Sequence, residues 1–213
     1  MNNNLFGTIR ISDKLYISVF SFAAFLFFII SQGASYSIVF AISAIIHELS
    51  HIIFLHLYKA KINRITIFPF GIDILCETKH LSYKKELVCT LAGSFANLLF
   101  SFVSYFILLR FPTPLLLFFV LSNLFLGIMN LIPVSFFDGG KALRLLLYDY
   151  IELDKAFYIH RSLDILSSIL FVIFAVFLAL LSDFNISVCA VIIYASLSNI
   201  IQSIQYNTST KIP

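Results

Sequence analysis

The sequence predicts an all-α polytopic membrane protein with six transmembrane helices, from its composition, the lengths of its apolar segments and the placement of its charges. Of the 213 residues, 60% are hydrophobic and only 12% are charged, a balance outside the range of soluble globular domains. A membrane-spanning helix needs about 20 largely apolar residues. Six segments meet this requirement, and together they predict a single integral membrane domain over residues 1–213. The segments are residues 15–31, 35–57, 87–109, 114–134, 163–181 and 186–204.

The basic residues support this span count. With six spans, all of the 14 Lys and Arg residues except Arg110 fall on one side of the membrane. Positively charged residues gather on the cytoplasmic side of membrane proteins, so both termini are predicted to be cytoplasmic. The three cysteines have no paired spacing, which predicts neither a disulfide framework nor a Cys₄ metal site.

The second predicted span contains the pattern His-Glu-x-x-His over residues 47–51. On a helix, residues four apart are separated by about 40° around the axis, so His47 and His51 project from one face and can bind one Zn²⁺. Glu48 lies where a general base can take a proton from water at such a site. Strongly charged side chains cost about 2.5–3.5 kcal/mol each in a membrane helix, so a chain that keeps ionisable groups there uses them. The pattern therefore predicts a zinc protease that works within the bilayer.

A second unusual segment, residues 130–140, lies at the end of the fourth predicted span. Pro133 breaks a helix, and Gly139-Gly140 permits backbone angles that other residues avoid. Apolar residues then recur up to residue 150, which predicts that the helix restarts. A helix broken at membrane depth is tolerated where it is buried in protein or lines a wet cavity. Asp138 beside this break suits a third ligand, because two histidines, one carboxylate and an open fourth position form a catalytic zinc arrangement.

These polar residues have alternative interpretations. Asp138 also suits a buried polar group or an ion-pair partner of Lys141 or Arg144. Asn130 suits a contact to the substrate or oxyanion, and equally a hydrogen bond that caps the broken helix. Asn97 lies among small residues that allow close helix packing, so it suits either a donor to an oxyanion or a packing amide.

Residues 65–74 predict a small β or re-entrant element on the cytosolic side. Their side chains alternate loosely between apolar and polar, and the segment contains Pro69 and Gly71. A protease within the membrane must unwind its substrate helix, because a helical peptide bond is shielded by its own hydrogen bonds. An exposed strand edge can hold the unwound peptide by strand addition.

Taken together, these residues resemble the site-2 protease family of intramembrane zinc metalloproteases. The family's first motif, H-E-x-x-H, is matched by His47, Glu48 and His51. Its second motif, N-x-x-P-x(4)-D-G, is matched by Asn130, Pro133, Asp138 and Gly139. Residues 68–71 resemble the family's loop after the zinc helix, and residues 92–97 resemble its A-G-P-x-x-N element. These matches span residues 47–140, which correspond to the family's three-helix catalytic core.

Within the family, the chain most resembles the sporulation-type branch, which cleaves a membrane-associated pro-sigma factor in spore-forming bacteria. The resemblance implies a bacterial cell membrane as the location. Ser50, Ser94 and Ile72 depart from the residues usual in the family, which are Gly, Pro and Gly. Neither the CBS domain of the sporulation branch nor a PDZ domain is expected in these residues.

The predicted mechanism uses one Zn²⁺ per chain, with His47, His51 and Asp138 as ligands and Glu48 as general base. Asn97 or Asn130 would contact the substrate or stabilise the tetrahedral oxyanion. Pro133, Gly139 and Gly71 are expected to have a structural role in the motifs and not a chemical one. The expected partners are a membrane-associated protein substrate, the lipid bilayer and, in some settings, inhibitory membrane proteins, with no nucleic acid.

Two rival functions use the same residues. A transporter or metal-ion carrier also has intramembrane polar residues and broken helices. It needs no general base, however, and inverted repeats would be expected, whereas none is detectable. The second rival is a catalytically inactive binding partner, although such proteins usually lose a ligand or the glutamate.

Overall fold

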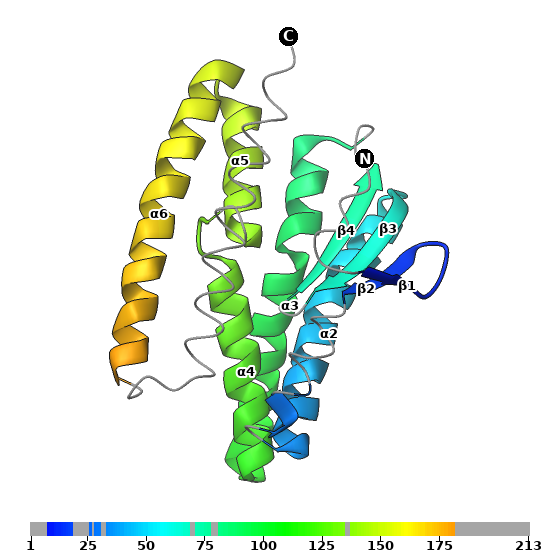
Figure 1. Ribbon diagram of the computed structural model, residues 1–213, viewed down its shortest axis with the longest axis vertical. Coiled ribbons are helices and arrows are strands. Elements are labelled where there is room, and N and C mark those ends of the chain that lie inside the picture. Colours follow the sequence, from blue (N-terminus) through cyan, green and yellow to red (C-terminus); the bar gives the residue numbers. More distant parts are fainter. Residues whose placement is uncertain are drawn as a thin grey trace. The chain divides into compact units, whose positions relative to one another are not determined.

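The computed structural model describes residues 8–18, 26, 28–30, 33–68, 71–77, 81–134 and 137–181. Within these residues the chain is mostly helical and contains one small sheet (Figure 1). It divides into two compact units, Met1–Ile128 and Met129–Pro213. The single domain over residues 1–213 stays a prediction.

Three helices dominate the first unit: α2 (Ala34–Leu57), α3 (Tyr83–Arg110) and α4 (Pro114–Asn130). Helix α2 contains no Gly or Pro, and it begins after Gly33, whose φ of 86° is readily adopted only by glycine. Helix α4 opens with Pro114, whose fixed φ and missing N–H suit the first helical position. Helices α2 and α3 lie side by side (Figure 1) and present the residues of the functional site to each other.

The packed faces of these helices are small and polar, whereas their outer faces are apolar. The buried residues of α3 include Gly93, Ser94 and Asn97, and those of α2 include Ser43 and His47. Large apolar side chains are instead exposed along the helices, among them Ile45, Leu49, Ile53, Leu99, Phe102 and Leu121. Small residues let membrane helices approach closely, and lipid solvates the apolar outer face. The distribution is therefore that of a protein packed within a bilayer.

Among the described residues, α2 and α3 are long and apolar enough to cross a membrane, and α4 is apolar but shorter. The predicted spans at 35–57, 87–109 and 114–134 coincide with these helices, except that α4 ends at Asn130 rather than at 134. The predicted span at 163–181 lies inside a longer helix, α6 (Leu153–Leu181). The predicted span at 186–204 lies outside the described residues, so the count of six stays a prediction.

The first predicted span, 15–31, is wrong at its beginning. Residues Leu15–Ser18 form a strand, β2, and the described helical residues of this segment are 26 and 28–30. A short, largely apolar run such as Leu15-Tyr16-Ile17 is compatible with a strand as well as a helix. Strand pairing decides the outcome, because β2 hydrogen-bonds to neighbours on both sides.

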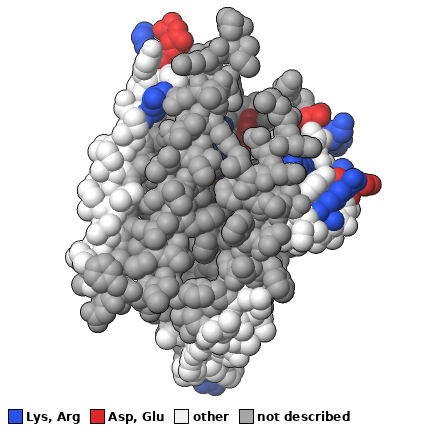
Figure 2. All heavy atoms as spheres, viewed as in Figure 1, with Lys and Arg blue, Asp and Glu red and all other residues white. Residues whose placement is uncertain are grey.

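The sheet has four strands in the order β1-β2-β3-β4: β1 (Thr8–Arg10), β2, β3 (Lys61–Phe68) and β4 (Gly71–Glu77). Strand β2 pairs parallel to β3, and the other two pairs are antiparallel. The segment for which a strand or a re-entrant hairpin is expected forms β3 and β4, and its cytosolic placement stays a prediction. On the visible face, charged side chains gather around these strands and at helix ends. The sides of the described helices between their ends show no charged side chains (Figure 2).

In the second unit, α5 (Asp138–Tyr150) and α6 pack against each other. Helix α4 ends at Asn130 and is followed by a turn, and the next helix, α5, begins at Asp138. This break and restart confirm the interruption expected from Pro133 and Gly139. His160 on α6 donates from Nε2 to the Gly140 carbonyl oxygen (3.2 Å), which ties α6 to the first turn of α5.

Candidate metal centre

The two histidines of α2 face one another within the first unit. His47 Nε2 and His51 Nε2 are 3.2 Å apart, and the two rings are nearly perpendicular. The four-residue spacing on a continuous helix produces this geometry, as the sequence pattern predicts. His47 is only 6% exposed and His51 is half-buried, so His47 is the more shielded of the two from bulk water.

Each histidine has a hydrogen-bond acceptor at its other ring nitrogen. His51 Nδ1 lies 2.8 Å from the carbonyl oxygen of Cys89, and His47 Nδ1 lies 3.2 Å from Oδ1 of Asn97. A carbonyl oxygen can only accept, so both Nδ1 atoms carry the proton in the neutral rings. The two unprotonated Nε2 atoms then lie 3.2 Å apart, an arrangement that a cation or a proton shared by them stabilises.

The donor geometry fits zinc. Two nitrogens bound to one tetrahedral Zn²⁺ at about 2.0–2.1 Å lie about 3.3 Å apart, close to the 3.2 Å between the two Nε2 atoms. A histidine that ligates zinc through Nε2 and donates from Nδ1 to an oxygen is the usual arrangement in metalloproteins. The pair therefore offers two unprotonated nitrogens whose spacing suits zinc, and ligation by them stays a prediction.

Gly93 on α3 makes room for the imidazoles. A Cβ at this position would contact His51 Nε2, and it would lie 2.8 Å from both Cε1 and Nε2 of His47. Even the smallest side chain would occupy the space beside the two ligand nitrogens. Glycine is required here for close approach, and its backbone angles are those of a helix.

Glu48 follows His47 on α2 and is half-buried. Its place in the sequence is that of the general base of H-E-x-x-H sites, and this role stays a prediction.

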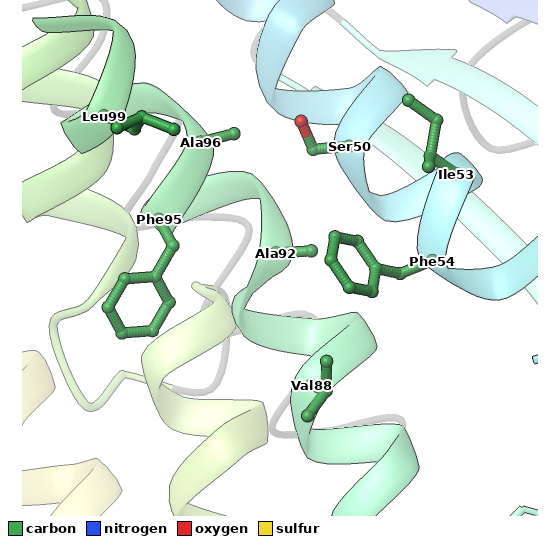
Figure 3. Close-up of a pocket in the computed structure, with 8 residues that line it drawn as sticks. All are labelled: Ser50, Ile53, Phe54, Val88, Ala92, Phe95, Ala96 and Leu99. Carbon is green, nitrogen blue, oxygen red and sulfur yellow. The ribbon is translucent and has the colours of Figure 1, made fainter. Parts of the chain in front are cut away.

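An apolar groove lies between α2 and α3 (Figure 3). Ser50 precedes His51 and Ala92 precedes Gly93, and both residues line the groove together with Ile53, Phe54, Val88, Phe95, Ala96 and Leu99. The Ser50 hydroxyl donates to the Ile46 carbonyl oxygen (2.7 Å), so this polar side chain is already engaged. The groove thus offers no reactive group of its own.

Asp138 is the first residue of α5 and belongs to the second unit. Its Oδ1 lies 3.4 Å from Lys141 Nζ, so the ion-pair interpretation of Asp138 is confirmed in part. Lys141 is half-exposed and the pair is one helical turn apart, which makes it a weak interaction. Ligation of the metal by Asp138 stays a prediction.

The remaining predicted residues lie at element ends. Asn130 is the last residue of α4, Pro133 follows in the turn and is exposed, and Gly71 begins β4. A Cβ on Gly139 would contact the carbonyl group of Leu131 and lie 2.7 Å from that of Ile132. Gly139 therefore lets the restarted helix pass directly beside the broken chain.

Asn97 has partners other than substrate. It is fully buried, its Oδ1 faces His47, and its Nδ2 donates to the Ser43 carbonyl oxygen and to Asn123 Oδ1, each at 3.2 Å. Sequence reasoning did not single out Asn123 or Ser43. A signal existed, because an amide in the middle of an apolar span is costly unless it has a function or a partner.

Comparisons with known proteins agree with this chemistry. The model of peptidase family M50 matches residues 110–177. A zinc metalloprotease of Methanocaldococcus jannaschii is 31% identical over 122 residues, which cover 54% of this chain and 35% of the relative. The chain thus spans about a third of the length of that curated relative.

Structural similarity extends further. The solved structure of the site-2 protease from Methanocaldococcus jannaschii is similar to this chain with a TM-score of 0.67 and 25% sequence identity. The similarity covers 90% of this chain and 92% of the solved chain. The family match, the zinc metalloprotease relative and this similarity together show that the chain is similar to peptidase family M50 and to a site-2 protease.

Proposed function

We propose that the protein is an intramembrane zinc metalloprotease that hydrolyses a peptide bond in or near a transmembrane segment of a membrane-associated protein. The observation that carries this proposal is the separation of 3.2 Å between the Nε2 atoms of His47 and His51 on an apolar helix. Both rings are held as donors through Nδ1, so both Nε2 atoms are ready to ligate. The match to the M50 family model and the similarity to a solved site-2 protease support the same chemistry.

The proposed ligand set is His47, His51 and Asp138. Two imidazoles and one carboxylate are the donor types that catalytic zinc sites use, and they leave the fourth position open. A zinc ion held there would supply a Lewis acid that makes water more acidic and polarises the scissile carbonyl.

Glu48 is the proposed general base. Its carboxylate accepts a proton from the attacking water and then passes that proton to the leaving amine. Asn130, at the end of α4, is the proposed donor to the oxyanion that develops on the substrate. The sequence motif assigns Asn97 as an alternative donor, but both of its amide hydrogens already have acceptors.

The sheet provides a place for an unwound substrate. Strand β4 lies at one edge of the four-stranded order, and a peptide in extended conformation can add to a sheet edge through backbone hydrogen bonds. This proposal gives a function to the strands β3 and β4, which follow the histidine-bearing helix α2 along the chain.

A bacterial cell membrane with both termini in the cytoplasm is the proposed location. The orientation follows from the basic residues, all of which except Arg110 share one predicted side. The bacterial membrane rests on the resemblance to the sporulation-type branch. The finer proposal is a pro-sigma factor as substrate, and it rests on the resemblance of the motifs to the sporulation-type branch. The rival function, a transporter, gains no support from the observations above.

The decisive experiment compares Glu48→Gln with the unchanged chain in cells that co-express a membrane-associated substrate. The variant should bind zinc normally and lose cleavage, with kcat/KM lower by roughly 100-fold or more because a general base typically contributes about 10²–10⁴-fold. Glu152→Gln is the matched control. It makes the same change at an exposed residue, one that pairs with Lys155, and it should cleave normally.

Two outcomes would count against the proposal. Full cleavage by Glu48→Gln would remove Glu48 from the mechanism. Cleavage by a His47→Ala variant that contains no zinc would remove the metal, and with it the proposed function.

A further inference from the structure

A chain of buried hydrogen bonds crosses α2, α3 and α4 and ends on the imidazole of His47. Asn123 on α4 donates from Nδ2 to Ser43 Oγ on α2 and to the carbonyl oxygen of Phe119, each at 2.9 Å. Asn97 on α3 donates from Nδ2 to Asn123 Oδ1 and to the Ser43 carbonyl oxygen, each at 3.2 Å. Asn97 Oδ1 lies 3.2 Å from His47 Nδ1.

The chemistry of these groups permits one assignment of the protons. The carbonyl oxygens of Phe119 and Ser43 can only accept, so Asn123 and Asn97 must both direct Nδ2 toward them. Asn97 Oδ1 is then the acceptor that faces the ring, and His47 must donate from Nδ1. The unprotonated nitrogen of His47 is therefore Nε2, the atom that lies 3.2 Å from His51 Nε2.

Burial makes this assignment persistent. Ser43, Asn97 and Asn123 are each 0% exposed, so water does not compete for their hydrogen bonds. In surroundings of low polarity such bonds are strong, and leaving one unmade is costly. The ring of His47 is thus held in one tautomer and one orientation by residues on two neighbouring helices.

We propose that Asn97, held by Asn123 and Ser43, is a positioning residue that keeps His47 in the tautomer and orientation that bind the metal. The inference rests on the proposed function, because the ion for which His47 is prepared is the zinc of the proposed protease. It also assigns Asn97 a role other than contact with the oxyanion, because an oxyanion could receive an amide hydrogen only by displacing Ser43 or Asn123.

The test compares two substitutions at one position. Asn97→Asp keeps an acceptor for His47 Nδ1 and removes the N–H groups that an oxyanion would need, whereas Asn97→Leu removes both. Zinc affinity of the detergent-solubilised full chain is measured by competition with a chelator of known affinity. The Leu variant should bind zinc about 10–100-fold more weakly, as is typical when a partner of a ligating histidine is lost. The Asp variant keeps the acceptor but loses the donors to Ser43 and Asn123, so its zinc affinity should fall less than that of the Leu variant, and it should retain measurable cleavage.

Ser101→Ala is the matched control. The Ser101 hydroxyl on α3 donates to the Val120 carbonyl oxygen on α4 at 2.9 Å and is buried. The control therefore removes a buried hydrogen bond between the same two helices that does not reach His47. It should lower the thermal stability of the protein and leave zinc affinity unchanged.

Three results would overturn the inference. The first is a Leu variant that binds zinc as well as Ser101→Ala does. The second is a folded Asp variant that loses zinc as the Leu variant does. The third is an Asp variant that binds zinc normally and has no cleavage. That result would indicate that the Asn97 amide donates to the oxyanion.

A measurement on the unchanged zinc-loaded protein covers the case in which the Asp variant does not fold. ¹⁵N NMR of the histidine side chains, with His47 assigned by difference, should show a protonated Nδ1 and a metal-bound Nε2. Coordination through Nδ1 would overturn the inference. If the unchanged chain binds no zinc at all, the proposed function fails. If it binds zinc and Asn97→Leu does so equally well, only this inference fails.

Discussion

At the scale of single residues, the arrangement of His47 and His51 depends on a neighbouring glycine, Gly93, as much as on the two imidazoles themselves. His47 and His51 approach each other because Gly93 leaves space between α2 and α3. A helix interior with glycine is less stable than one with alanine by about 1 kcal/mol. The chain accepts this cost where the two imidazoles require the volume.

Replacing Gly93 with alanine should therefore disturb metal binding more than the fold. The added methyl group meets the ends of two side chains and not backbone, so the fold should persist, but turning the His47 ring breaks its hydrogen bond to Asn97 and should lower the melting temperature. Zinc affinity should drop by roughly 10-fold or more, since the rings lose their alignment. Gly127→Ala is the control, because its methyl group would contact Leu98 and Ser94 instead. A Gly93→Ala protein with normal zinc affinity would contradict this account.

At the scale of elements, the broken helix between α4 and α5 needs a residue without a side chain at its restart. The chain turns after Asn130, and Gly139 passes against the backbone carbonyl groups of Leu131 and Ile132. Backbone atoms cannot rotate away as a side-chain tip can. Because Gly139 lies against the chain reversal at Leu131 and Ile132, it also fixes the position at which α5 begins with Asp138.

Gly139→Ala should therefore destabilise the protein by about 1–3 kcal/mol, the usual cost of inserting a methyl group into a packed site. Thermal unfolding in detergent measures the effect. Lys155→Ala, an exposed change in the same unit, should be neutral within about 0.5 kcal/mol. An alanine variant as stable as the unchanged chain would show that the turn relaxes freely.

At the scale of the whole molecule, the orientation in the membrane is the prediction that connects all spans. Arg110 ends α3 and lies beside the short link to α4, whereas the other basic residues share the opposite predicted side. The positive-inside rule then places the link between α3 and α4 outside and the strands β3 and β4 inside.

Cysteine labelling tests this orientation in a background that lacks the three native cysteines. Phe111→Cys, at an exposed position after α3, should react with a membrane-impermeant thiol reagent applied to intact cells. Asn63→Cys, in β3, should react only after the membrane is permeabilised. The reverse pattern would overturn the predicted orientation.

The helices and the histidine pair were predictable because their signals are local. Apolar length predicts α2 and α3, the spacing of His47 and His51 predicts their common face, and Pro133 with Gly139 predicts the break after α4. Other features depend on distant partners. Strand β2 forms where an apolar run suggested a span, because β1 and β3 complete its hydrogen bonds.

The sequence by itself determined the chemistry on offer: two imidazoles one helical turn apart, a glutamate between them and a carboxylate at a helix break. It did so because periodicity and backbone restriction act over a few residues. The tertiary structure alone decided which lone pair each imidazole presents and that Asn97, Asn123 and Ser43 converge on His47. Those facts depend on which groups three helices bring within hydrogen-bonding distance, and residues up to 80 positions apart in the chain meet there.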